Sequence, residues 1–355
     1  MILKTWISMV IAVLLASTMI VGLGCGRRNK GSDHLVPIRI GWQVAWATQG
    51  QLALILQKTN DLELNGLQGD FRSFTYGAPL SEAALSGQLD VAFIGDQPAI
   101  NLLSRSTDWK LIGRLMDFRV AIVVPLNSSI GSVADLKGKT LGIPFGASTH
   151  RVALQMLTEA GLDPVKDVHI VNIDITEQSD IVNSASGKMW SGIDAFASWD
   201  HHIALYESKM LARILKSGTA LGVIAMSKKF IDDHPDAAVG FMAAFKLAYY
   251  FYANNRDKAD GWFAETTAGK FDMNILRQVA SIEPNLLTTD IQTMHVILTK
   301  ENLDILQTAA DFAFAQKLIQ NEVTVAMVVE PKPAESSDVK LLNDSSLKAR
   351  LEVLQ

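Results

Sequence analysis

Short apolar stretches alternate with amphipathic ones along the first part of the chain. Leu52, Ile55 and Leu56 recur at helical spacing, and Gly87 stops a second, shorter helix. Short apolar runs between these helices predict strands. The expected elements are, in order, strand 38–42, helix 51–58, strand 71–74, helix 79–85 and strand 91–94. This alternation predicts layers of parallel sheet covered by helices.

A second round of the same pattern begins near residue 139. Val152, Met156, Leu157 and Ala160 form one apolar helix face that Gly161 ends. The expected elements are strand 139–143, helix 149–160, strand 169–173 and strand 195–198, followed by helices 237–252, 274–280 and 301–319. The tail after Pro333 is expected to be loosely ordered.

An internal repeat connects the two rounds. Residues 90–96 (DVAFIGD) align with residues 194–200 (DAFASWD) at an offset of 104, and Gly41 and Thr48 align with Gly142 and Thr149 at an offset of 101. Two similar offsets predict two similar lobes that face each other across a cleft.

The amino-terminal segment has the pattern of an export signal. Lys4 precedes an apolar stretch over residues 7–23, and Cys25, the sole cysteine of the chain, follows it. The segment resembles a bacterial lipoprotein cleavage box, in which Cys25 would carry the lipid. The alternative is that Cys25 is only a small residue within an ordinary signal peptide or an uncleaved anchor. The predicted product is an extracytoplasmic, membrane-anchored lipoprotein.

Composition narrows the function classes. The chain has 355 residues, 48% of them hydrophobic, and once Lys4 is removed 31 basic residues face 37 acidic ones. A mildly acidic chain without a long basic run is a poor nucleic-acid binder. A single cysteine excludes disulfides within the chain and cysteine-based metal sites. The length predicts two lobes.

Two turns are candidate anion sites because each leaves backbone N–H groups free at a helix start. The first spans residues 144–150 and includes Ser148 and Thr149, and the second spans residues 76–79, with Tyr76 and Gly77. The competing interpretation is that Ser148 or Thr149 only caps its helix.

Acidic and aromatic residues also fall at strand ends. Asp96 and Asp200 follow two buried strands, where α/β sheets bind ligands, and could hold a polar group of the ligand or cap the next helices. Trp42, Trp46 and Trp199 could line the pocket or belong to the core.

Catalytic patterns are sparse. His201 and His202 are adjacent, so they point in different directions and make a poor metal site. No phosphate-binding loop is present. The sequence predicts no cofactor, no metal and no enzymatic activity.

These segments resemble the substrate-binding proteins of bacterial ABC importers for alkanesulfonates, taurine and nitrate. The similarity rests on Ile40–Gln43, Ser86–Asp90, Gly95–Ala99, Val133–Lys139, Gly146–His150 and Ile193–Asp200. His201 stands where those relatives commonly have proline, and the cysteine cluster of the pyrimidine-synthesising relatives is absent.

The resemblance implies an α/β, two-lobed type II periplasmic binding protein. It implies strand crossings between the lobes near residues 120–125 and 217–226. The expected organisation is a signal peptide 1–25, a linker 26–36, a first lobe of 37–121 and 223–325, a second lobe of 122–222, and a tail 326–355. The expected ligand-binding residues are Gln43, Trp46, Tyr76, Gly77, Asp96, Gln97, Ser148, Thr149, Trp199 and Asp200.

The leading hypothesis is therefore a monomeric solute-binding protein. It would close on a small anionic or zwitterionic ligand and deliver it to an ABC permease and its ATPase. The alternatives are an enzyme on the same fold, similar to a pyrimidine-precursor synthase, and a ligand-sensing module.

Overall fold

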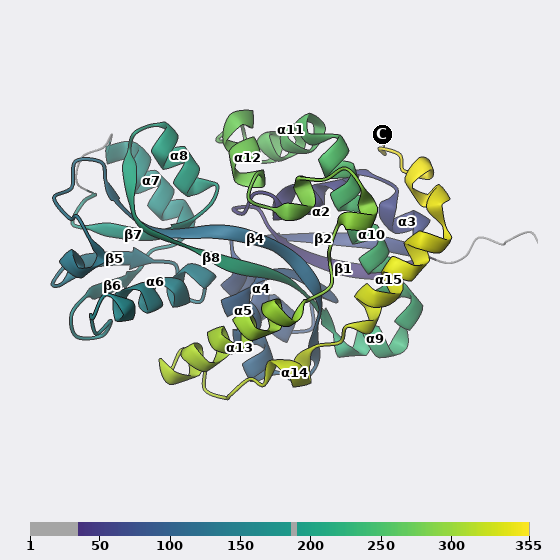
Figure 1. Cartoon of the computed structure of the whole chain (residues 1–355), viewed down its shortest axis with the longest axis horizontal. Helices are drawn as coiled ribbons and strands as arrows, with labels where there is room; N and C mark the ends of the chain where they lie inside the picture. The colour runs from purple at the N-terminus through teal and green to yellow at the C-terminus, as the bar shows by residue number, and fades with distance from the viewer. Residues whose placement is uncertain (1–34, 186–189, 355) are drawn as a thin grey trace, which may run out of the picture. The chain divides into compact units, whose positions relative to one another are not determined.

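The computed structural model describes residues 35–185 and 190–354 (Figure 1). The predicted signal peptide, Cys25 and nearly all of the linker 26–36 lie outside the described residues. No helix within the described ranges is both long enough and apolar enough to cross a membrane.

Eight strands form one sheet in the order β2-β1-β3-β8-β4-β7-β5-β6. They are β1 (Val36–Gln43), β2 (Leu67–Phe74), β3 (Val91–Gly95), β4 (Trp109–Pro125), β5 (Thr140–Ile143), β6 (His169–Asn172), β7 (Ala195–Trp199) and β8 (Ala212–Ser227). β1 runs parallel to β2 and β3, and β5 runs parallel to β6 and β7. β4 and β8 pair antiparallel and join these two parallel groups.

Helices cover both faces of the sheet. The α-helices are α2 (Gln49–Lys58), α3 (Asp61–Leu64), α4 (Gly77–Leu85), α5 (Asp96–Arg105), α6 (Ser148–Glu159), α7 (Ile175–Ala185), α8 (His202–Ser208), α9 (Lys228–Asp233), α10 (Pro235–Asn254), α11 (Arg256–Thr266), α12 (Met273–Ala280), α13 (Lys300–Ala315), α14 (Val325–Val328) and α15 (Lys332–Asn343). Short 3-10 helices are η1 (Val133–Leu136), η2 (Pro284–Leu286), η3 (Ile291–Thr293) and η4 (Ser345–Arg350).

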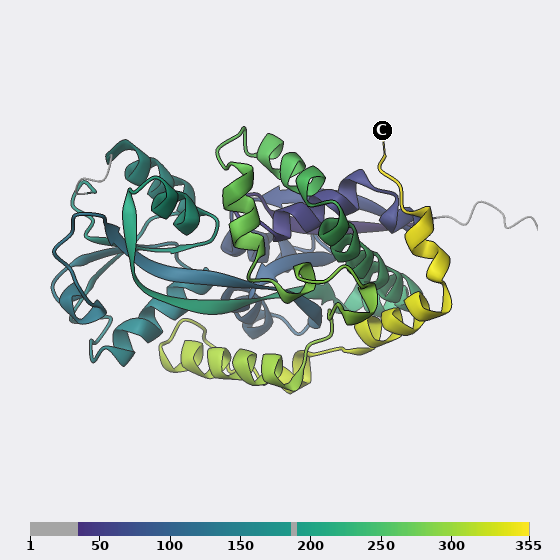
Figure 2. The same ribbon diagram turned by 45° about the horizontal axis from the view of Figure 1, so that its top comes forward.

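The two views show how the layers are arranged. At the β5–β7 end, α7 and α8 lie on one side of the strands and α6 lies on the other (Figures 1 and 2). β4 and β8 run from this end to the β1–β3 end, where α2, α10 and α11 cover one side. α13 contacts both α5 and α6.

The apolar run of β3 is buried because both faces of the sheet are covered. Val91 and Phe93 point into one hydrophobic core, and Ala92 and Ile94 point into the second. Phe93 meets Phe245 of α10 with ring centroids 5.4 Å apart. A strand that is buried on both faces accounts for a continuous rather than alternating apolar pattern.

The predicted repeat is present in the hydrogen bonding. The backbone N–H of Arg39 on β1 donates to Asp90 Oδ2 at 2.9 Å, and that of Thr140 on β5 donates to Asp194 Oδ2 at the same distance. The strand registers agree, because Ile40 pairs with Val91 and the equivalent Leu141 pairs with Ala195. The two parallel groups are therefore built alike.

Most predicted elements are confirmed within a few residues, with two corrections. The tail after Pro333 is not loosely ordered: it forms α15 and η4, and Lys246 of α10 donates to Asp338 of α15 at 2.7 Å. The helix expected to reach residue 319 ends at Ala315, because Lys317 adopts a left-handed backbone conformation with φ 58°. The crossings expected near residues 120–125 and 217–226 fall within β4 and β8.

Candidate functional site

Seven of the ten predicted ligand residues surround one small cavity, here called the Ser148 cavity. Its volume is about 20 Å³. It is lined by Gln43, Trp46, Tyr76, Gly77, Gly95, Pro98, Phe118, Ala147, Ser148, Thr149 and Trp199. These residues come from the ends of β1, β3 and β7, from the starts of α4, α5 and α6, and from β4.

Ser148 and Thr149 begin α6, and neither caps it. The N-cap position belongs to Ala147, whose side chain has no hydrogen-bonding group. Both hydroxyls are buried, and neither has a hydrogen-bond partner among the residues described. The capping interpretation is therefore wrong for this pair. A buried polar atom without a partner costs about 1–3 kcal/mol, so these hydroxyls are suited to receive a ligand.

Trp46 adds a third polar atom of this kind. Its indole packs against Phe118 with ring centroids 4.6 Å apart and is only 3% exposed. Its Nε1–H has no acceptor anywhere in the described ranges. An indole N–H can only donate, so a ligand atom that satisfies it must be an acceptor.

Hydrogen bonds within the protein fix the position of Gln43. Its Nε2 donates to the carbonyl of Phe93 at 2.9 Å, and its backbone N–H donates to Gln49 Oε1 at 2.8 Å. Gly77 lies beside Pro98, and a Cβ built on Gly77 would stand 2.5 Å from Pro98 Cγ. The start of α4 can therefore approach α5 only because residue 77 is glycine.

Asp96, Gln97 and Asp200 do not line the Ser148 cavity. Asp96 accepts from Arg151 Nη2 at 2.6 Å, and its other oxygen accepts from the backbone N–H of Gln97 at 2.6 Å. Asp200 accepts two bonds from Arg119, at 2.8 and 2.9 Å. Burial raises the pKa of the Asp200 carboxyl, and the Arg119 guanidinium opposes that shift. Both carboxylates are engaged by arginines.

The two walls of the Ser148 cavity touch each other. Trp199 Nε1 donates to the carbonyl of Ala45 at 2.8 Å, and the backbone N–H of Ala47 donates to His201 Nδ1 at 3.0 Å. A Cβ built on Gly95 would stand 2.5 Å from Ser148 Oγ. The remaining space holds about one water molecule, because one water needs roughly 10–15 Å³.

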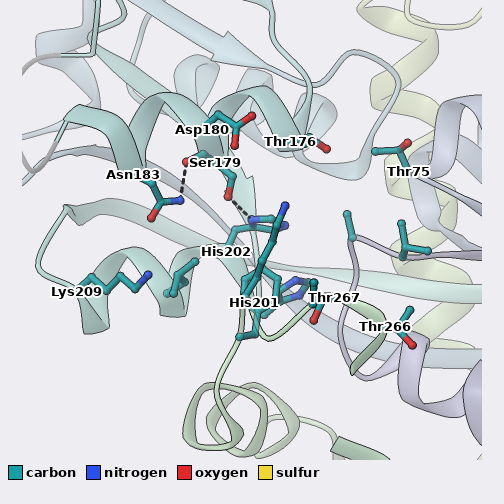
Figure 3. Close-up of a pocket in the computed structure, with 16 residues that line it drawn as sticks. Thr75, Thr176, Ser179, Asp180, Asn183, His201, His202, Lys209, Thr266 and Thr267 are labelled. Carbon is teal, nitrogen blue, oxygen red and sulfur yellow. Dashed lines mark hydrogen bonds between the residues drawn. The ribbon is translucent and has the colours of Figure 1, made fainter. Parts of the chain in front are cut away.

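A larger cavity lies on the other side of the segment 44–47, and we call it the His202 cavity. Its volume is about 570 Å³, and Figure 3 shows His201 and His202 at its centre, between Lys209 and Thr75. It is lined by Val44, Ala45, Thr75, Thr176, Ser179, Asp180, Asn183, His201, His202, Leu205, Lys209, Thr266, Thr267, Ala268, Lys270 and Phe271. Burial lowers the pKa of His202 to about 3 and that of His201 well below its usual value, so both rings are neutral.

None of the ten predicted ligand residues lines the His202 cavity. The signal that the sequence offers for it is the pair His201–His202, directly after the Trp199–Asp200 dipeptide. Within residues 35–185 and 190–354, no group of three or more potential ligands could hold a metal ion.

The Ser148 cavity has the chemistry of an anion site made from neutral groups. No charged side chain is among its described lining residues. The first backbone N–H groups of an α-helix lack intrahelical acceptors, so the starts of α4 and α6 carry partial positive charge. With the Trp46 indole and two hydroxyls, these donors can surround a small group of acceptor oxygens.

Comparisons with known proteins identify the family of the chain. A sequence profile of the family described as NMT1/THI5 like matches residues 76–259, more than half of the chain. A putative aliphatic sulfonates-binding protein of Bacillus subtilis (strain 168) is 26% identical over 332 residues, which cover 90% of this chain and 93% of the relative.

Solved structures share the fold. The alkanesulfonate-binding protein SsuA from Xanthomonas axonopodis pv. citri, bound to MOPS, superimposes with a TM-score of 0.68 at 22% identity, covering 83% of this chain and 98% of that one. The desulfurization enzyme DSZB superimposes with a TM-score of 0.62 at 15% identity, covering 86% and 99%. The resemblance to sulfonate-binding proteins is confirmed, and the fold is that of periplasmic binding proteins.

Proposed function

The chain belongs to the NMT1/THI5-like family, and we propose that it is a solute-binding protein whose Ser148 cavity takes the anionic head of a small sulfonate-type ligand. One observation carries this proposal. Trp46, Ser148 and Thr149 line the same cavity, and the buried atoms Trp46 Nε1, Ser148 Oγ and Thr149 Oγ1 have no partner in the described part of the chain. A sulfonate offers three acceptor oxygens to them.

The pairing of the two aspartates favours a simple anion over a zwitterion. Asp96 and Asp200 each bind an arginine, so neither carboxylate is available to hold an amine without losing that partner. Breaking a buried ion pair costs about 3–5 kcal/mol. Alkanesulfonates are therefore expected to bind more tightly than taurine. Nitrate is a smaller competitor for the same donors.

Binding requires the cavity walls to separate, because about 20 Å³ cannot hold a sulfonate group. The first lobe, 37–121 and 223–325, would move relative to the second lobe, 122–222, about the long strands β4 and β8. Closure on the ligand would re-form the Trp199–Ala45 bond. The ligand favours the closed form only by its higher affinity for that form.

Export and anchoring complete the proposal. Cys25 would tether a monomeric protein to the membrane surface, and an ABC permease with its ATPase would receive the ligand. Tethering raises the effective concentration near the permease without new contacts. Mass spectrometry of the mature amino terminus tests the lipid. The lipid assignment is wrong if the mature chain does not begin with a modified Cys25, or if a Cys25→Ser variant remains in the membrane fraction.

The proposed protein releases its ligand unchanged. DSZB shows that enzymes use this fold, so the proposal needs a direct check. Sulfonate recovered after prolonged incubation with the protein is expected to be chemically intact. Stoichiometric or catalytic conversion would support the enzyme alternative instead.

Calorimetric titration tests the ligand class. Butanesulfonate, taurine, nitrate and sulfate are titrated into the purified protein, with pentanoate as a carboxylate control. We expect saturable binding of butanesulfonate, weaker binding of taurine and still weaker binding of pentanoate. Absence of binding by every sulfonate and by nitrate would refute the ligand class.

A further inference from the structure

The His202 cavity is separated from the Ser148 cavity by the segment 44–47. Val44 and Ala45 line the larger cavity, while their neighbours Gln43 and Trp46 line the smaller one. The bonds from Trp199 Nε1 to the Ala45 carbonyl and from the Ala47 N–H to His201 Nδ1 hold this segment against the opposite wall. A ligand in the Ser148 cavity therefore does not account for the His202 cavity.

A chain of hydrogen bonds orients His202 and favours one tautomer of its ring. The Tyr206 hydroxyl donates to Ser179 Oγ at 3.3 Å, and Ser179 Oγ lies 3.0 Å from His202 Nδ1. Because Ser179 Oγ accepts from Tyr206, its own hydrogen is free to point at His202 Nδ1. The neutral ring then carries its hydrogen on Nε2. Figure 3 shows the contact between His202 and Ser179.

The Nε2–H of His202 is a buried donor. His202 is 5% exposed, and its Nε2 has no hydrogen-bond partner within the described residues. Lys270 also lines the cavity and lies close enough to lower the pKa of His202 further. A donor beside an ammonium group favours a ligand with an anionic acceptor at this position.

The remaining lining of the His202 cavity combines charged and apolar side chains. Its described charged residues are two lysines, Lys209 and Lys270, and one acidic residue, Asp180. Phe271 stands edge-on to the His202 ring with centroids 5.3 Å apart, and Leu205 adds an apolar surface. The volume lies within the range of small-molecule sites, roughly 300–1,000 Å³.

We propose that the His202 cavity is a second binding site, for a small organic anion with an apolar body. The anionic group accepts from His202 Nε2 and Lys270, and the body packs against Phe271 and Leu205. A small aromatic carboxylate matches this arrangement, and benzoate is the probe.

The experiment combines calorimetry with nuclear magnetic resonance of the protein labelled with ¹⁵N-histidine. Benzoate is titrated into the unaltered protein, His202→Phe, Lys270→Met and the double variant Ser148→Ala/Thr149→Val. His234→Phe is the matched control, because His234 lines neither cavity. Circular dichroism verifies that each variant is folded, and His202→Gln keeps a donor at this place should the phenylalanine variant fail to fold.

We expect benzoate to shift the His202 Nε2–H resonance. His202→Phe and Lys270→Met should each weaken benzoate binding about tenfold or more, as loss of a charge-assisted hydrogen bond does. His234→Phe and Ser148→Ala/Thr149→Val should bind benzoate as the unaltered protein does.

Three results would overturn the second site: an Nε2 without hydrogen, absence of benzoate binding at millimolar concentration, or equal benzoate affinity in folded His202→Phe. Butanesulfonate binding, measured by calorimetry in the same variants, reports on the Ser148 cavity separately. Failure of one site is thus distinguishable from failure of the other.

Discussion

Replacing the hydroxyls of Ser148 and Thr149 should change ligand affinity and protein stability in opposite directions. In Ser148→Ala/Thr149→Val, each lost bond to a charged ligand costs about 1.5–3 kcal/mol, which is roughly a ten- to hundredfold change in Kd per hydroxyl. Both groups are buried without partners in the described part of the chain. Their removal should therefore raise the free energy of unfolding by about 1–2 kcal/mol.

Calorimetric titration with butanesulfonate measures the affinity, and urea unfolding without ligand measures the stability. Ser337→Ala is the matched control, since Ser337 is fully buried and its hydroxyl donates to the Ala334 carbonyl at 2.7 Å, away from both cavities. That control should lose about 0.5–1.5 kcal/mol of stability and keep its affinity. Unchanged affinity in the double variant would refute the site, and lowered stability would refute the claim that the hydroxyls lack partners.

Three further predictions concern buried ionisable groups. Arg151→Gln leaves Asp96 buried without its ion pair and should lower the free energy of unfolding by about 3–5 kcal/mol in urea unfolding; a loss below about 1 kcal/mol would contradict the pairing. The pKa values of His150, at about 4, of His202, at about 3, and of His201 are all lowered by burial, so the unfolded chain binds more protons between about pH 6.5 and 4. Stability should therefore fall as the pH drops through this window, by up to about 1.4 kcal/mol per pH unit for each histidine, and a flat profile in unfolding experiments would refute it. Burial raises the pKa of Asp61 to about 8, so the folded state holds a proton that the unfolded chain releases above about pH 4. The unaltered protein should therefore lose about 1.4 kcal/mol of its free energy of unfolding per pH unit as the pH rises to 8, and Asp61→Asn should abolish this loss. If the free energy of unfolding of Asp61→Asn falls as steeply between about pH 6.5 and 8 as that of the unaltered protein, the prediction is wrong.

The parallel layers could be predicted from the sequence because their signals are local. β3 is an apolar run buried on both faces, and α6 shows its apolar face at helical spacing before Gly161. The repeat was visible because Asp90 and Asp194 perform the same task, accepting a backbone N–H from the neighbouring parallel strand. This shared task requires an aspartate at the same position of each parallel group, which makes the repeat detectable in the sequence.

The partners of charged residues could not be predicted, because they depend on distant segments. Asp96 and Asp200 follow similar strands, yet Asp96 meets Arg151 from α6 and Asp200 meets Arg119 from β4. Helix α15 is stabilised by its packing against α10, including the Lys246–Asp338 pair. No local sequence pattern predicts this contact. Seven of the predicted ligand residues line one cavity, whereas the His202 cavity depends on the tertiary contacts of α7 and α8.

A crystal structure of the protein with bound butanesulfonate tests the central claim most directly. The account predicts sulfonate oxygens within about 3 Å of Trp46 Nε1, Ser148 Oγ and Thr149 Oγ1. It also predicts that the Asp96–Arg151 and Asp200–Arg119 pairs remain intact in the complex. A sulfonate group bound elsewhere, or held by Arg119 or Arg151 after either pair has broken, would contradict it.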